Sequence, residues 1–240
     1  VVVGTDWFDE EGVHRVGKNS FPLPDDLPLL SEALADIGYR TAGFVENSHL
    51  VPTQGFGRGF DIYEKAKPAA SSLEQWLASL EDDEPFFGYV HLIGPHDPYD
   101  GGNAGEGAGE YRTRFGEYDS KIDWTDLGYK KKVKSFTEQD LLQARALYDG
   151  ELNYFDQEEI APLIAWMKAN ERYEETLIVV TADHGEELYD HGRWAHGQTL
   201  YEEVTRITLI IKLPAGISGL SAGTRVEEIV EQIDVFPTLC

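Results

Sequence analysis

The chain has 240 residues, of which 41% are hydrophobic, enough for one α/β domain with a complete core. It carries 20 Lys and Arg against 44 Asp and Glu, a formal net charge of −24, which disfavours nucleic acids and anionic membranes as partners. Cys240 is the single cysteine, so an internal disulfide framework and a cysteine-based zinc site are excluded.

The sequence predicts no membrane span, because it has no run of about 18 apolar residues. No charged segment followed by an apolar one opens the chain, so no signal peptide is visible, and the compartment stays open with the cytoplasm slightly favoured. Acidic residues are spread along the whole chain, a pattern that favours adaptation to high salt over an ordinary acidic enzyme. Nothing in the sequence indicates the oligomeric state.

The first half of the chain alternates helical and strand patterns, which is typical of α/β units. Helix starts are predicted from Asp and Ser residues that precede apolar positions at helical spacing. In chain order we predict a strand end at 1–3, a helix from Asp25 or Asp26 to Ile37, a strand at 39–45, a helix from Ser71 or Ser72 to Leu80, and a buried strand at 86–92.

Residues 101–136 begin Gly-rich, end in a lysine cluster and show no clear periodicity. We predict a surface insertion there, or a lid over the site, within a single domain that spans residues 1–240. For the lysine cluster, a solvated loop is favoured over anion capture.

A long helical region is predicted from Thr137 to about Asn170, with Thr137 as the N-cap and Asp140 at the capping-box position. Pro162 should kink or split this helix, because proline removes an amide donor. The β-branched run at 177–180 predicts a buried strand of a parallel sheet. Another strand is expected at 207–213, and a helix begins near Asp234.

Candidate site residues follow the two buried strands. Asp183 and His184 leave the strand at 177–180, at the carboxyl end where open α/β sheets bind ligands. His191 and His196 follow on the same loop, and His96 lies between two prolines after the strand at 86–92. A carboxylate among imidazoles suits a divalent metal and an anionic substrate. The alternative is a structural turn, in which Asp183 bonds its own backbone and the following glycine takes a positive φ.

Six segments occur in a familiar order: LPDDLPLLSEALADIGYRTAGFVEN, GFGRGFDIYE, YVHLIGPHDPYD, YDGELNYFD, LIVVTADHGEELYDHGRWAHGQTLYEE and QIDVFPTL. Together they resemble the sulfatases of the alkaline-phosphatase superfamily, over nearly the whole chain from about Gly12 to Leu239. The resemblance implies a three-layer α/β/α fold around a mixed, mainly parallel sheet. It also implies hydrolysis of a small-molecule or glycan sulfate ester at a metal-centred site.

The resemblance also assigns roles to individual residues. Asp183 and His184 match the positions that bind one divalent metal in the family, with Ca²⁺ favoured and Mn²⁺ or Zn²⁺ as alternatives. His196 and His96 match positions that contact the sulfate and the leaving oxygen, where an imidazole can donate a proton.

The chain also departs from the family pattern. The family nucleophile is a Cys or Ser in C/S-x-P-x-R that becomes formylglycine, and its first strand carries two adjacent Asp ligands; this sequence has neither. We therefore expect that it lacks an amino-terminal segment and a carboxyl-terminal one, and that alone it binds metal weakly and turns over poorly. In the alternative, Asp6 is a ligand in a divergent first strand.

Two other functions stay open at the level of sequence. One is hydrolysis of a phosphonate or phosphate ester, or phosphoethanolamine transfer, within the same superfamily. The other is a non-catalytic module that binds a sulfated or phosphorylated glycan, which the absent nucleophile favours.

Overall fold

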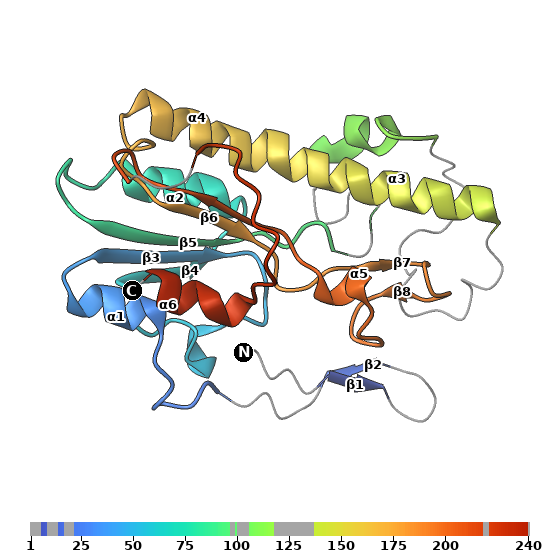
Figure 1. Cartoon of the computed structure of the whole chain (residues 1–240), viewed down its shortest axis with the longest axis horizontal. Helices are drawn as coiled ribbons and strands as arrows, with labels where there is room; N and C mark the ends of the chain where they lie inside the picture. The colour runs from blue at the N-terminus through green and yellow to red at the C-terminus, as the bar shows by residue number, and fades with distance from the viewer. Residues whose placement is uncertain are drawn as a thin grey trace.

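The structure, a computed structural model, describes residues 6–8, 14–16, 22–96, 99, 106–117, 137–217 and 221–239. The short hairpin β1–β2 precedes the α/β elements (Figure 1). The helices and strands in chain order are β1 (Asp6–Phe8), β2 (His14–Val16), α1 (Leu30–Asp36), β3 (Arg40–Val45), η1 (Pro52–Gln54), β4 (Ile62–Lys65), α2 (Ala69–Leu77), β5 (Phe86–His91), η2 (Glu106–Thr113), α3 (Glu138–Phe155), η4 (Asp156–Ile160), α4 (Ala161–Ala169), β6 (Ile178–Thr181), β7 (Glu187–Leu188), β8 (Trp194–Ala195), α5 (Glu202–Thr205), β9 (Leu209–Lys212), η5 (Gln232–Asp234) and α6 (Val235–Leu239).

A parallel sheet of order β4-β3-β5 forms the middle layer of the fold. Helices α1 and α6 lie on one side of the strands, and α2 with the α3–α4 rod lies on the other (Figure 1). This arrangement confirms the predicted three-layer α/β/α class. The strand β4 was not predicted from the sequence, because its four residues carry no clear alternation.

The main core lies between the parallel sheet and helices α2 and α4. Fully burying one large apolar side chain of this kind stabilises the fold by about 1.5–3 kcal/mol. The buried residues that pack there are Ala42, Phe44, Ala69, Ala70, Leu73, Trp76, Leu77, Leu80, Leu163 and Met167.

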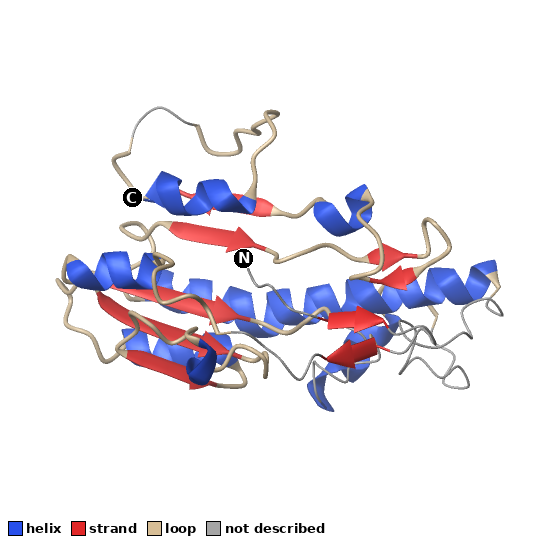
Figure 2. Cartoon of the chain, turned by 90° about the horizontal axis from the view of Figure 1, so that it is seen from below, coloured by secondary structure: helices blue, strands red, loops and turns tan. Residues whose placement is uncertain are grey.

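The strand β6 does not pair as predicted. It pairs antiparallel with β9, from Ile178 opposite Lys212 to Thr181 opposite Leu209, and Figure 2 shows the two strands set apart from the parallel sheet. Its burial is also incomplete, since Val180 is 43% exposed. The apolar run correctly predicted a strand, but pairing direction depends on the neighbour that the fold supplies.

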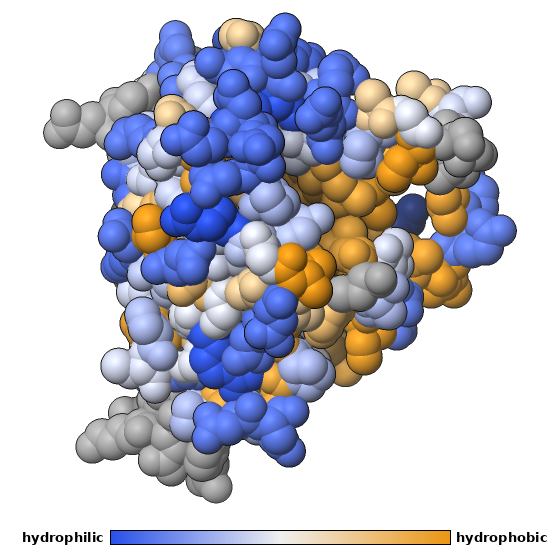
Figure 3. Space-filling view, turned by 90° about the vertical axis from the view of Figure 1, so that its left-hand side faces the viewer, coloured by the Kyte–Doolittle hydropathy of each residue, from blue (hydrophilic) through white to orange (hydrophobic). Residues whose placement is uncertain are grey.

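Apolar surface remains uncovered on this pair of strands. On β9, Ile210 is 58% exposed and Ile211 is 40% exposed. Figure 3 shows hydrophobic surface that lines a hollow on one face of the molecule.

The predicted start of α1 was wrong. The helix begins at Leu30, and its N-cap residue, Leu29, makes no side-chain cap hydrogen bond. The residues at 25–26 belong instead to the preceding turn, where the guanidinium of Arg58 donates to the carbonyl oxygens of Pro24 and Leu27. A tertiary contact therefore shapes the segment that the local pattern assigned to the helix.

The predicted start of α2 at Ser71 was also wrong, because the helix begins two residues earlier at Ala69. Its first amides are bonded by carboxylates from distant segments: Ala69 N–H donates to Glu46 Oε1 at 3.4 Å, and Ala70 N–H donates to Glu159 Oε2 at 3.5 Å. Helix amino termini need such acceptors, and here the tertiary fold supplies them in place of a local serine.

The long helical region agrees with its prediction at both of the positions singled out. Thr137 caps α3 in a capping box with Asp140. The helix then passes through a π-helical turn, Asp156–Ile160, directly before Pro162 in the first turn of α4. A wider turn accommodates the carbonyl group with which the proline ring would otherwise clash. The regular α-helical hydrogen bonding is therefore interrupted, while α3 and α4 continue in line as one rod (Figure 1).

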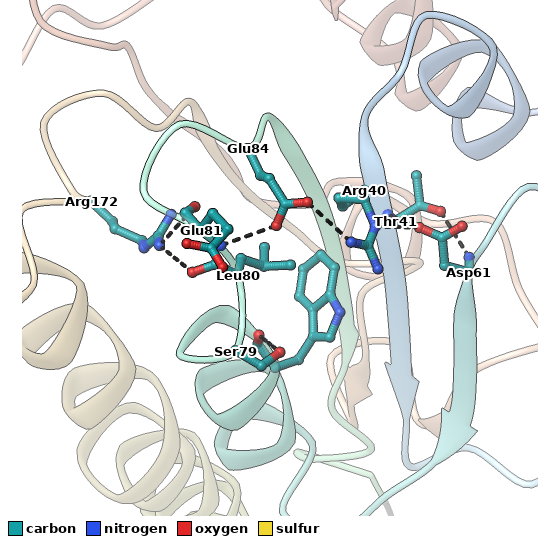
Figure 4. Close-up of polar contacts among 9 residues, drawn as sticks. Arg40, Thr41, Asp61, Ser79, Leu80, Glu81, Glu84 and Arg172 are labelled. Carbon is teal, nitrogen blue, oxygen red and sulfur yellow. Dashed lines mark hydrogen bonds and ion pairs between the residues drawn. The ribbon is translucent and has the colours of Figure 1, made fainter.

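A polar cluster joins the amino-terminal ends of the parallel strands. Arg40 Nε donates to Asp61 Oδ2 at 3.2 Å, and Arg40 Nη1 donates to Glu84 Oε1 at 3.2 Å (Figure 4). Asp61 also accepts the Thr41 N–H, and that bond is the main cause that lowers the pKa of Asp61. These contacts tie β3 to the segments before β4 and β5, at the end of the sheet opposite the candidate site.

Part of the predicted insertion at 101–136 is described. Tyr111 is buried, stacks edge-on against Tyr154 of α3 and donates its hydroxyl to Glu158. The lysine cluster at 130–134 and the strand end at 1–3 lie outside the described residues. A role of the insertion as a lid remains a prediction. Among the residues that the structure describes, no helix is both long and apolar enough to cross a membrane.

Candidate active site

The candidate site lies where the carboxyl ends of β3, β5 and β6 converge. His91, at the end of β5, interacts electrostatically with a carboxylate from each of the other two strand ends. Burial lowers the pKa of His91, while the carboxylates of Asp183 and Glu46 oppose that shift. Segments from three strands therefore meet at one edge, as open α/β sheets arrange their sites.

Three of the predicted site residues are brought together there. The rings of His184 and His196 lie 3.9 Å apart between centroids, tilted by 33°. The ring of His96 meets that of His196 edge-on at 5.6 Å. His96 comes from the loop after β5 and the other two come from the loop after β6, so only the tertiary fold could place them side by side.

The Asp183–His184 pair is arranged so that two ligand atoms face the same region. His184 Nδ1 lies 2.8 Å from the carbonyl oxygen of Gly185, which can only accept, so Nδ1 is the donor and Nε2 carries the lone pair in the neutral form of the ring. That Nε2 lies 3.7 Å from Asp183 Oδ1. A backbone carbonyl that orients the second ring nitrogen is the usual support of a metal-binding histidine.

The structural-turn interpretation is partly correct as well. Asp183 Oδ1 accepts the backbone N–H of His184 at 3.0 Å, so the carboxylate does bond its own loop. The glycine is needed for close approach and not for a positive φ: a Cβ on Gly185 would lie 2.1 Å from the carbonyl oxygen of Glu203, and its N–H donates to Val204 O at 2.7 Å. A firmly held turn and an exposed carboxylate are compatible with ligand binding.

Two residues that the sequence prediction missed support His196. Glu186 Oε1 lies 2.9 Å from His196 Nδ1, and Tyr99 donates its hydroxyl to the other oxygen, Glu186 Oε2, at 2.6 Å. Because a carboxylate only accepts, Nδ1 donates to it, and this bond fixes the orientation of the His196 ring. The Glu186 side chain is 6% exposed. Burial, and next the charge of Glu186, raises the pKa of the neighbouring Tyr148 to about 12.

His191 lies apart from this cluster. Its ring stacks on Tyr201 at 3.8 Å, and its Nε2 lies 3.3 Å from Glu203 Oε2. Both contacts are with the first turn of α5 and its N-cap residue. The sequence grouped His191 with the site because of its spacing, and no contact of its ring with the other site histidines is described.

The loop that carries the histidines is fixed by polar contacts. Glu187 on β7 is 1% exposed and accepts from the backbone N–H of Arg193 and the hydroxyl of Thr199. At its base, Gln232 Nε2 donates to the carbonyl oxygens of Ala182 and Asp183. The hairpin β7–β8 was not predicted, since each strand has only two residues.

The residues present fit part of a metal site. Asp183 and His184 offer an oxygen and a nitrogen that suit a divalent cation. Within the described part of the chain, no group of three or more His, Cys, Asp or Glu side chains is close enough to hold a metal ion. Asp183 and His184 could supply two ligands, and a complete metal site would need more than these two.

Comparison with known proteins identifies the family of this chain. A family model, Sulfatase, matches residues 9–240. The chain belongs to the sulfatase family. Arylsulfatase K of Mus musculus is 24% identical over 185 residues, which cover 69% of this chain and 32% of that protein. The low-salt glycan biosynthesis sulfotransferase Agl7 of Haloferax volcanii is 29% identical over 235 residues, covering 94% of this chain and 47% of that protein.

The fold of this sulfatase-family chain is shared with solved structures. The phosphonate monoester hydrolase of Agrobacterium radiobacter superposes with a TM-score of 0.66 at 19% identity, over 91% of this chain and 58% of that chain. At this identity the likeness shows the fold alone. The chain spans about a third to a half of the length of the curated relatives named above.

Proposed function

We propose that this chain contributes to the hydrolysis of sulfate esters, with His196 and His96 as catalytic residues and Asp183 with His184 as metal ligands. The observation that carries the proposal is the convergence of the three imidazoles, one of them supported by the buried Glu186. Membership of the sulfatase family supports the reaction class.

The arrangement suits protonation of a leaving alcohol. Hydrolysis breaks the S–O bond of R–O–SO₃⁻, water adds to the sulfur, and the departing oxygen needs a proton. A protonated His196 donates that proton from Nε2, while Glu186 stabilises the positive ring and fixes its orientation through Nδ1. Tyr99 holds Glu186 in turn, so the donor is fixed in advance of the reaction.

The ring of His96 lies edge-on to that of His196, with 5.6 Å between the ring centroids. In its protonated form it attracts the sulfate oxygens, which gain negative charge as the ester bond breaks. A divalent ion held by Asp183 and His184 supplies further charge compensation when bound. Local positive charge is needed here, because the net charge of −24 repels an anionic ester.

We propose a small-molecule or glycan sulfate ester as the substrate. The named relatives are an arylsulfatase and a glycan biosynthesis sulfotransferase, and both names support sulfate as the transferred group. The phosphonate monoester hydrolase shares the fold, so phosphonate and phosphate esters belong in the same assay panel. A glycan-binding module without catalysis is the remaining alternative.

The test combines metal binding with turnover on the complete natural protein. Metal content and affinity are measured for the wild type, for Asp183→Ala and for His184→Ala. Release of 4-nitrophenol from its sulfate, phosphate and phenylphosphonate esters is measured with His196→Ala and His96→Ala. His191→Ala is the matched control, because it removes an imidazole from the same loop outside the cluster.

We expect the wild type to bind one divalent ion and to prefer the sulfate ester. The two ligand variants lose the ion, His196→Ala and His96→Ala each lower kcat about 100-fold or more, and His191→Ala keeps both properties. Preference for the phosphonate or phosphate ester would overturn the choice of substrate. Metal binding without turnover of any ester would favour the binding module, and absence of metal binding would leave the Asp183 loop as a structural turn.

A further inference from the structure

Two buried carboxyl groups lie beside the site and take no part in the mechanism above. Glu46 follows β3 and Glu159 lies in the π-helical turn, and each is 6% exposed. Their carboxyl groups accept from the consecutive backbone amides of Ala69 and Ala70, so they lie close together at the start of α2. Two carboxylates buried this close together repel each other, so a proton shared between them would stabilise the pair.

Glu46 connects this pair to the loop that carries His96. Its Oε2 accepts the backbone N–H of Ile93 at 3.1 Å, three residues before His96, while its Oε1 accepts from Ala69 at the start of α2. The backbone N–H of Glu46 itself donates to the carbonyl oxygen of His91 at 2.9 Å. One buried side chain thus ties the end of β3 to the segment that positions a catalytic imidazole.

The same helical turn supports this loop by packing. Phe155 directly precedes the π-helical turn and is 4% exposed. A Cβ on Gly94 would lie 1.7 Å from Phe155 Cε2, so the loop backbone rests against the aromatic ring. The wider π turn follows Phe155, and it carries Glu159. Turns of this kind occur often at functional sites.

The surroundings of Glu159 favour the protonated form of its carboxyl group. Burial, and next the charge of Glu46, raises the pKa of Glu159 to about 7, while the Ala70 amide and Lys67 oppose the rise. Two other groups interact electrostatically with the pair. His91 on β5 interacts with Glu46, and Tyr154 on α3 interacts with both carboxyl groups and with Glu158. Lys67 is the cation among the groups that affect the pKa of Glu159.

We propose that Glu46 and Glu159 share one proton and act as positioning residues for His96. With one proton the pair carries a single charge and bonds Ile93 and both first amides of α2. Loss of that proton places two negative charges in one buried site, so the carboxylates separate and the loop of His96 loosens. The consequence for catalysis rests on the proposed function, whereas the positioning itself does not.

The test uses Glu46→Gln, which weakens the acceptor for Ile93, and Glu159→Gln, which retains a hydrogen-bond donor toward Glu46 at every pH. Glu158→Gln is the matched control, because this neighbouring carboxylate is exposed and bonds Tyr111 instead. Hydrogen exchange of the Ile93 amide and the ring ¹⁵N shifts of His96 are followed by NMR from pH 5 to 8.5. The pH profiles of kcat and KM are recorded on 4-nitrophenyl sulfate.

In the wild type we expect protection of the Ile93 amide to decline above pH 7, beyond the intrinsic change of exchange rate. Glu159→Gln abolishes that decline and extends the plateau of kcat to higher pH. Glu46→Gln speeds exchange of Ile93 about tenfold or more and lowers kcat more than it changes KM. Glu158→Gln matches the wild type.

Two results would overturn the proposal. One is an unchanged pH dependence of Ile93 exchange in Glu159→Gln, and the other is unchanged exchange and His96 shifts in a folded Glu46→Gln. If Glu46→Gln does not fold, the pH dependence of Ile93 exchange in Glu159→Gln tests the proposal by itself. If no sulfate ester is hydrolysed, the proposed function fails, and the exchange and shift measurements still decide the positioning.

Discussion

Replacement of Glu159 by Gln should make the protein more stable at neutral and alkaline pH. The side chain is buried in the folded protein, where its pKa rises from an ordinary value of 4.5 to about 7, chiefly through burial and the neighbouring Glu46. Each pKa unit corresponds to about 1.4 kcal/mol, so this rise is worth about 3 kcal/mol of stability.

The direction follows from proton binding. Because the folded protein holds this proton more tightly than the unfolded chain, the contribution is fully present below pH 4.5 and is lost as the pH rises through about 7. Glutamine resembles the protonated side chain in size and in its ability to donate to Glu46. The variant therefore keeps the favourable contact at pH 8, where the wild type has lost it.

Urea unfolding of both proteins between pH 5 and 8 measures the effect. The free energy of unfolding of the wild type should fall by about 3 kcal/mol relative to that of Glu159→Gln across this range. His91, whose pKa is lowered, contributes in the opposite direction, but it is present in both proteins and cancels in the comparison. Parallel curves for the two proteins would refute the assignment of a shared proton to this pair.

Other changes test the site and the fold. Glu186→Gln should lower kcat about 100-fold with little change in KM, because His196 loses its orienting carboxylate; equal activity would remove Glu186 from the mechanism. Gly185→Ala should destabilise by about 1–3 kcal/mol in thermal unfolding, since its Cβ would meet the Glu203 carbonyl at 2.1 Å. Thr137→Ala should cost about 1 kcal/mol in urea unfolding through loss of the cap. Finally, the melting temperature should rise between low and molar NaCl, because salt screens a net charge of −24; a flat response would contradict adaptation to high salt.

Sequence alone predicted the features that depend on local chemistry. The apolar runs at 39–45 and 86–92 identified strands of the parallel sheet, and Thr137 with Asp140 identified the start of α3. Pro162 correctly marked the division of the long helical region, because proline acts on its own helix. The order of six short segments was enough to identify the family.

Features that depend on distant partners were predicted poorly. The starts of α1 and α2 were misplaced because Arg58, Glu46 and Glu159 provide polar contacts that no local pattern contains. The predicted pairing direction of β6 was wrong for the same reason. An apolar run indicates a strand, but it does not indicate which strand will pair with it.

Sequence likewise predicted only part of the candidate site, and the rest required the tertiary structure. Sequence proposed Asp183, His184, His196 and His96 as site residues, because these residue types follow strands at the edge where ligands bind. Only the tertiary structure separated His191 from the cluster and joined Glu186 to His196. It alone also brought Glu46 and Glu159, 113 positions apart in the sequence, to the consecutive amides that begin α2. A buried carboxylate looks like any other acidic residue until the fold shows what surrounds it.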